Sequence, residues 1–212
     1  MNFIHFERKS FYDIILSKKI SGGNAMNKIL VSDYDNTFYL NDEDIERNKK
    51  AVQKFRKKGN LFVLATGRSY IDIKSKIDKY NIEYDYLIIN HGATIIGENE
   101  EVLYNFSIKD SIISDIKLDL ELDNIEYLNN KPEKSKDKIY FCCRMLESRL
   151  NFENEKLTKI AVKYDDSVDV SRINKKISDK YQDVNSYHVS KNMIEIISKD
   201  INKSYSLIHD TN

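Results

Sequence analysis

A short apolar segment that ends in two closely spaced carboxylates constrains the fold of this chain most. Residues Lys28 to Ser32 read KILVS, and Asp33, Asp35 and Thr37 follow. A short apolar run that is stopped by acidic and amide residues is typical of a buried parallel strand. In open α/β sheets, ligands bind at the loops beyond the carboxyl ends of such strands. The segment therefore predicts an α/β fold with a ligand site at its two aspartates.

The spacing of Asp33 and Asp35 suits phosphoryl transfer through a covalent intermediate. In an extended segment, residues i and i+2 point to the same side, so both carboxylates can face one bound phosphate. One carboxylate can attack phosphorus while the other, kept protonated, donates its proton to the leaving oxygen. Taken alone, the same residues are also ordinary turn formers after a strand. Further motifs are needed to choose between these interpretations.

A second strand is predicted at Leu61 to Ala65, and it ends in a polar turn. Thr66 supplies a hydroxyl, Gly67 permits a tight turn, and Ser69 can begin a helix. Backbone amides at a helix N-terminus bind phosphate well. Arg68 can hold a substrate anion, but it can equally be solvated or paired with a nearby acid.

A third strand, Tyr86 to Ile89, also ends in polar residues. Asn90 and His91 follow it, and either can contact substrate, although His91 can as well cap the loop. Lys203 comes shortly after the apolar run Met193 to Ile197, where a helix is expected to begin. Taken alone, Lys203 would be an ordinary surface lysine. Only its place in the order of motifs makes it a candidate site residue.

At these positions the chain resembles the haloacid dehalogenase superfamily and, within it, the Cof-type sugar phosphatases, whose cap domain is inserted after the third strand. The similar motifs are Asp33 to Thr37, Thr66 to Arg68, Asn90 to Ala93, and Lys203. The resemblance covers about residues 26 to 207. The family's fourth motif is an acidic loop that completes a magnesium site, and it is expected beyond Asn212, where this sequence stops.

The resemblance implies a role for each residue of the predicted site. Asp33 would be the nucleophile that becomes an aspartyl phosphate. Asp35 would protonate the leaving alcohol and later activate the water that hydrolyses the intermediate. Thr66, Gly67 and Lys203 would hold the phosphoryl group. Mg²⁺ would bind the Asp33 carboxylate and the Asp35 backbone carbonyl, with the fourth motif and water completing its coordination.

The implied activity is a magnesium-dependent phosphatase acting on a small phosphorylated metabolite, with a sugar phosphate as the first expectation. Arg68, Asn90 and His91 are the weaker candidates for substrate contacts. A truncated, non-catalytic relative that binds a phosphorylated ligand or a partner is an alternative, because the fourth motif is absent from this sequence. A sugar phosphomutase is a further alternative within the enzyme class.

The predicted elements indicate a Rossmann-like parallel sheet, incomplete at the C-terminus, with an inserted α+β cap domain. Asn41 or Asp42 is expected to cap the first helix of the sheet layer, a second helix is expected to start at Ser69, and Ser107 is expected to cap the first helix of the insertion. The predicted core is 26–106 with 189–212, so that Met193 to Ile197 returns the chain to the core. The cap is 107–188. Residues 1–25 form an N-terminal extension that can pack on the body, lie on a membrane surface or be non-native.

Charge and hydropathy exclude several function classes. The 34 basic and 34 acidic residues cancel, so no basic field of the kind that holds nucleic acid is expected. No apolar run has the length of a membrane span, and no signal peptide is recognisable. We expect a cytoplasmic protein. The strand Lys28 to Ser32 is expected to leave an unpaired apolar edge that favours self-association and aggregation.

Overall fold

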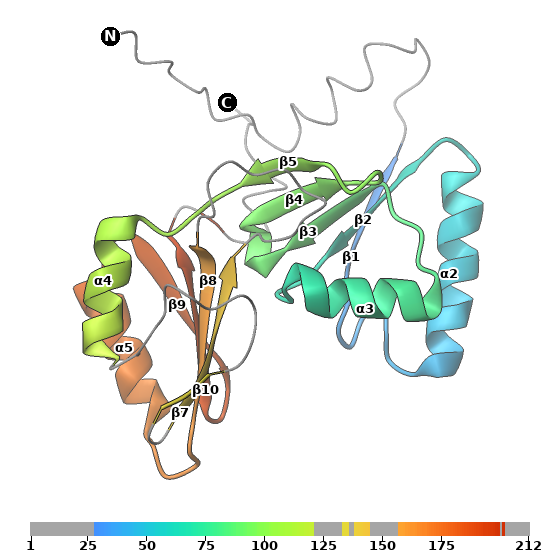
Figure 1. The fold of residues 1–212 in the computed structure, drawn as a ribbon. Helices are drawn as coiled ribbons and strands as arrows, with labels where there is room; N and C mark the ends of the chain where they lie inside the picture. The colour runs from blue at the N-terminus through green and yellow to red at the C-terminus, as the bar shows by residue number, and fades with distance from the viewer. Residues whose placement is uncertain (1–27, 121–132, 136–137, 145–156, 200, 202–212) are drawn as a thin grey trace, which may run out of the picture.

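The computed structural model describes residues 28–120, 133–135, 138–144, 157–199 and 201, and they form two sheets with helices (Figure 1). The first sheet has the strand order β1-β2-β3-β4-β5. Its strands are β1 (Ile29–Asp33), β2 (Leu61–Ala65), β3 (Tyr86–Ile89), β4 (Thr94–Gly97) and β5 (Val102–Asn105). β1, β2 and β3 are parallel, whereas β4 and β5 add an antiparallel hairpin. The α/β sheet predicted from the sequence is confirmed.

Two helices cover one face of this sheet, α2 (Asp42–Arg56) and α3 (Tyr70–Tyr80). The Asn41 side chain caps α2 by accepting from two backbone amides, and Ser69 caps α3 by accepting from the Asp72 amide, as predicted. Alternate residues of the strands face the helices. Phe62 and Leu64 of β2 pack with Ile45 and Val52 of α2 and with Ile73 and Ile77 of α3, while Val63 and Ala65 belong to the opposite face.

The second sheet is antiparallel and has the order β6-β7-β8-β10-β9. Its strands are β6 (Glu133–Ser135), β7 (Lys138–Arg144), β8 (Leu157–Tyr164), β9 (Val184–Ser190) and β10 (Met193–Ser198). The helices α4 (Asp110–Asp119) and α5 (Val170–Lys180) lie together on one side of it (Figure 1). Ile160, Val162, Ile194 and Ile196 form the core between this sheet and its helices. We call this unit the cap sheet.

Met193 to Ile197 does not return the chain to the first sheet, and this expectation is wrong. β10 pairs with β8 on one side and with β9 on the other. Only Lys191 and Asn192 separate β9 from β10, and strands joined by so short a connection become antiparallel neighbours. The cap sheet therefore extends through Ser198, beyond the predicted boundary at 188.

The first helix of the insertion also begins later than expected. α4 starts at Asp110, and Lys109 precedes it without a capping hydrogen bond from its side chain. The Ile108 amide donates to the Leu157 carbonyl of β8 at 2.8 Å, which holds the segment around Ser107 against the cap sheet instead of allowing it to begin a helix. A tertiary contact thus overrides the local capping signal.

β1 lies at the edge of the first sheet as far as the structure describes it. Its hydrogen-bonded partner there is β2, and Leu30 and Val31 are 40% and 37% exposed. The strand is parallel, as predicted, but the expectation that it is buried is wrong for the described part of the chain. Among the described residues the expected apolar edge is present, whereas self-association through it stays a prediction.

Some predicted features lie outside the described residues. They are the N-terminal extension 1–25 and Lys203. Within the described residues, none of the helices combines the length and the apolar composition that crossing a membrane requires.

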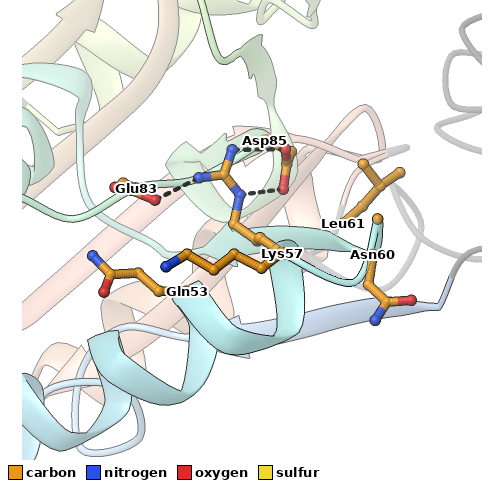
Figure 2. Close-up of a pocket in the computed structure, with 8 residues that line it drawn as sticks. Gln53, Lys57, Asn60, Leu61, Glu83 and Asp85 are labelled. Atoms are coloured by element: carbon orange, nitrogen blue, oxygen red, sulfur yellow. Dashed lines mark hydrogen bonds and ion pairs between the residues drawn. The ribbon is translucent and has the colours of Figure 1, made fainter.

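An ion-pair cluster secures the amino ends of β2 and β3, on the side of the sheet opposite the polar turns (Figure 2). Arg56, at the end of α2, donates two hydrogen bonds to the Asp85 carboxylate, both at 2.9 Å, and a third to Glu83. The Asp85 carboxylate also accepts from the Phe62 amide at 2.7 Å. Arg56, Glu83 and Asp85 line a pocket of about 530 Å³. Ligands of α/β sheets bind at the carboxyl ends of strands, so we assign this cluster a structural role.

Asp85→Ala should lower the free energy of unfolding by about 2 kcal/mol, because it leaves the Phe62 amide without its acceptor and weakens the anchorage of Arg56. The matched control is Glu83→Ala, which removes another carboxylate from Arg56. The Glu83 side chain is 49% exposed, so its loss should cost less than about 1 kcal/mol. Urea unfolding of both variants measures the difference. Equal losses would contradict the structural role given to Asp85.

Candidate active site

A pocket of about 750 Å³ lies between the carboxyl ends of the first strands and the cap sheet. It collects side chains from segments that are far apart in the sequence. The residues from the first layer are Asp33, Asp35, Gly67, Arg68, Ser69, Ile71, Asp72, Ser75 and His91, and those from the cap sheet are Lys159, Ala161, Val189, Ser190, Met193 and Glu195. Five residues of the predicted site therefore meet at one pocket: Asp33, Asp35, Gly67, Arg68 and His91.

The loop after β1 presents the two aspartates on one side. Asp33 is the last residue of β1, and its carbonyl accepts from the Phe38 amide at 3.0 Å. Tyr34, between the aspartates, turns into the core and is 1% exposed. Asn36 takes a left-handed conformation, with φ of 57°, as the chain turns back. The i, i+2 spacing thus places Asp33 and Asp35 at the same pocket, as the sequence predicted.

Arg68 forms a bidentate ion pair with Asp35. Its Nε and Nη2 atoms donate to the two carboxylate oxygens at 2.9 and 2.7 Å, and Nη1 donates to Asp72 at 2.5 Å. The hydrogen bonds to Asp35 are the main cause of the raised pKa of Arg68. The sequence left open whether Arg68 holds a substrate anion or is solvated or paired with a nearby acid. In the structure it is paired with a nearby acid. A contact with substrate stays a prediction.

Thr66 and Asn90 are buried beside the pocket and do not line it. The Thr66 hydroxyl oxygen accepts from the Arg68 amide at 3.2 Å. The Asn90 amide nitrogen donates to the Thr158 hydroxyl of β8 at 3.3 Å, so this residue joins the third-strand loop to the cap sheet. The roles predicted for both in phosphate or substrate binding remain predictions. Lys203 lies outside the described residues.

A cluster of charged side chains from the cap sheet was missed by the sequence analysis. Lys159 of β8 donates to Glu195 of β10 at 2.8 Å, and Glu195 also hydrogen-bonds the His91 ring. Burial is the largest single influence on the pKa of Glu195, and it raises that pKa. The hydrogen bond with His91 and the charge of Lys159 together outweigh burial and lower the pKa to about 2. A usable signal existed. Each is a charged residue inside a largely apolar strand, LTKIAVKY for Lys159 and MIEIIS for Glu195.

Gly67 is required by the close approach of His91. A Cβ atom built on Gly67 would lie 2.5 Å from the His91 Cε1 atom, which is far below van der Waals contact. His91 itself has φ of 57°, an uncommon backbone conformation for a residue other than glycine. Its ring also stacks on Tyr187 of β9, with the ring centroids 5.4 Å apart. His91 thus fits between the second-strand turn and the cap sheet.

The donor set at the aspartates partly fits magnesium. Proteins commonly bind Mg²⁺ through one or two carboxylates, together with water and phosphate oxygens. Asp33 and Asp35 could supply such ligands at the pocket. The described residues contain no group of three histidine, cysteine or acidic side chains arranged to hold a metal. Among the described residues, no third histidine, cysteine or acidic side chain therefore joins Asp33 and Asp35 as a ligand for Mg²⁺.

A family model for haloacid dehalogenase-like hydrolases matches residues 30–209. That match spans most of the chain and includes every predicted motif. The chain is a haloacid dehalogenase-like hydrolase. The Asp33–Asp35 loop and the Thr66–Arg68 turn of this hydrolase occupy the carboxyl ends of adjacent strands, which is the arrangement that the resemblance in its sequence implied.

Among relatives of the hydrolase, a protein of Buchnera aphidicola subsp. Schizaphis graminum named "Putative phosphatase" is 26% identical over 196 residues, covering 86% of this chain and 71% of that protein. Two further matches, at 35% and 32% identity, extend over 94 and 93 residues. In those, the matched region spans only about a third of the relative's length, 35% and 33%.

Solved structures share the fold of this hydrolase. A haloacid dehalogenase-like hydrolase from B. subtilis superposes with a TM-score of 0.63 at 15% identity, covering 85% of this chain and 76% of that chain. The sucrose-phosphatase of Synechocystis sp. PCC6803, solved with sucrose and phosphate, gives a TM-score of 0.54 at 16% identity, covering 86% and 68%. At these identities the likeness establishes the fold alone.

Proposed function

We propose that this hydrolase is a magnesium-dependent phosphatase of a small phosphorylated metabolite, with a sugar phosphate as the first candidate. One observation carries the proposal. Asp33 and Asp35 line a single pocket together with the glycine turn after β2, and the cap sheet forms the opposite wall. The name of the Buchnera relative supports phosphatase activity, and the name of the Synechocystis sucrose-phosphatase supports a sugar phosphate as the first candidate substrate.

In the proposed reaction, the Asp33 carboxylate attacks phosphorus and the bond from phosphorus to the ester oxygen breaks. Asp35 donates a proton to the leaving alcohol, and then removes a proton from the water that hydrolyses the aspartyl phosphate. Arg68 donates hydrogen bonds to both carboxylate oxygens of Asp35, so this ion pair must open before an Asp35 oxygen can reach the leaving group. The cap sheet limits the access of water to the pocket.

The charges of the pocket support a role for a divalent cation. Its described lining includes four acids, Asp33, Asp35, Asp72 and Glu195, against the two bases Arg68 and Lys159. Both bases are already paired with acids. A phosphate dianion would meet net repulsion there, and bound Mg²⁺ would offset it. Magnesium would be held at Asp33 and Asp35, where it would neutralise charge on the phosphoryl oxygens.

A release assay for inorganic phosphate tests this function. The purified chain is incubated with hexose phosphates, pentose phosphates, nucleotides and p-nitrophenyl phosphate, each with Mg²⁺ and with EDTA. We expect release from at least one sugar phosphate with Mg²⁺ and its loss with EDTA, because the pocket is too acidic to hold the dianion unaided.

The second candidate function is a non-catalytic relative that binds a phosphorylated ligand. It is favoured by the lack of a three-ligand metal cluster among the described residues. Binding of these compounds, measured by calorimetry, without any release of phosphate would support this candidate and contradict the phosphatase.

A further inference from the structure

Lys159 of the cap sheet reaches across the pocket to the turn that follows β2. Its side chain is 5% exposed, and its ammonium group donates to the Gly67 carbonyl at 2.8 Å as well as to Glu195. An ammonium group is costly to bury unless its hydrogen bonds are satisfied. The residues are far apart in sequence, 92 positions for Lys159 and Gly67. The contact is therefore a specific link between the cap sheet and the first sheet.

The contact orients one peptide group in the turn. The Gly67 carbonyl and the Arg68 amide belong to the same peptide. Lys159 holds the carbonyl, and the Thr66 hydroxyl oxygen accepts from the amide at 3.2 Å. Both polar ends of the peptide are thereby engaged. Rotation of this peptide would break an interaction with a charged group, so the turn is held in one orientation beside the aspartates.

Glu195 keeps Lys159 in place. Its two carboxylate oxygens engage Lys159 and His91 separately. His91 in turn lies against Gly67, where it leaves no room for a Cβ atom. The turn is thus held from the cap side by Lys159 and from the third-strand loop by His91, and Glu195 connects the two.

We propose that Lys159, held by Glu195, is a positioning residue through which the cap sheet fixes the orientation of the Gly67–Arg68 peptide, and with it the turn beside which phosphate is proposed to bind. The turn reaches its binding geometry when the cap sheet is docked on it. The proposal rests on the proposed function for the identity of the ligand, while the orientation of the peptide can be measured without turnover.

The test compares Lys159→Met with Lys163→Met. Lys163 lies on the same face of β8, four residues further along, but is exposed, so it provides the same chemical change away from the turn. We expect Lys159→Met to lower kcat/KM for p-nitrophenyl phosphate by about 10- to 100-fold, because small displacements of positioning groups have effects of this size. Lys163→Met should match the parent. Lys159→Arg should recover most of the activity, since a guanidinium can also donate to the Gly67 carbonyl.

Hydrogen exchange provides the readout that does not depend on turnover. Exchange in a peptide covering Thr66 to Ser69 should accelerate in Lys159→Met and remain unchanged in Lys163→Met. If Lys159→Met does not fold because Glu195 is left buried without its partner, the double variant K159M/E195Q removes both charges and should show the same acceleration.

The outcomes separate the two proposals. Unchanged exchange in Lys159→Met, or in the double variant where it is needed, overturns the positioning role whether or not the parent hydrolyses a phosphate ester. If the parent chain has no phosphatase activity, that result contradicts the phosphatase. Accelerated exchange in Lys159→Met would still support the positioning role. Loss of kcat/KM that Lys159→Arg does not recover, with unchanged exchange, would also overturn it.

Discussion

Asp33→Asn should lower the rate of phosphate release by about 10³-fold or more, because an amide cannot form the covalent intermediate. The side chains are nearly the same size, and Asp33 is only half-buried at the end of β1, so the variant should fold like the parent. Phosphate release with Mg²⁺ and p-nitrophenyl phosphate measures the effect, and circular dichroism checks the fold.

The matched control is Asp78→Asn. Asp78 is an exposed residue of α3 that pairs with Lys74 on the same helix, away from the pocket lining. Its replacement should leave activity unchanged. Asp35→Asn separates the two carboxylates by role, since it should still accept a phosphoryl group from a substrate with a good leaving group. A parental rate in Asp33→Asn would refute the proposed mechanism.

Replacement of the cap unit by a short linker should abolish most of the discrimination among sugar phosphates, by about 10- to 100-fold in the ratio of kcat/KM values. The replaced segment should be residues 107–198, because β10 belongs to the cap sheet. Six of the residues that line the pocket leave with it. The remaining sheet should stay folded, since its two main core clusters contain, among the described residues, none from the cap sheet.

The measurement is kcat/KM for a series of sugar phosphates in both proteins, with p-nitrophenyl phosphate as the reference substrate. That reference lacks a sugar for the cap sheet to select, so its rate should change less than those of the preferred substrates. An excised protein that kept the parent's substrate ranking would show that the cap sheet does not determine specificity.

Local signals in the sequence were sufficient for much of the first layer. The strands at Leu61–Ala65 and Tyr86–Ile89 are marked by apolar runs, and the caps Asn41 and Ser69 are local hydrogen-bonding residues. Each depends on a few neighbouring residues. For the same reason the i, i+2 spacing of the two aspartates predicted their shared pocket.

Local signals failed where distant segments compete for a residue. An apolar run such as Met193 to Ile197 can pair in either sheet, and its hairpin with β9 decided the question. A Ser107 cap was overridden by the hydrogen bond between Ile108 and Leu157. The exposure of β1 likewise depends on which strands lie beside it.

The sequence by itself determined that Asp33 and Asp35 could face one ligand, because their spacing is a property of one extended segment. Tertiary structure alone decided their surroundings. The ion pair of Arg68 with Asp35 joins residues 33 positions apart, and the bond from Lys159 to Gly67 joins residues 92 apart. Such contacts depend on how the sheets pack against each other, and a buried charge finds its partner only when that packing has brought the two elements together.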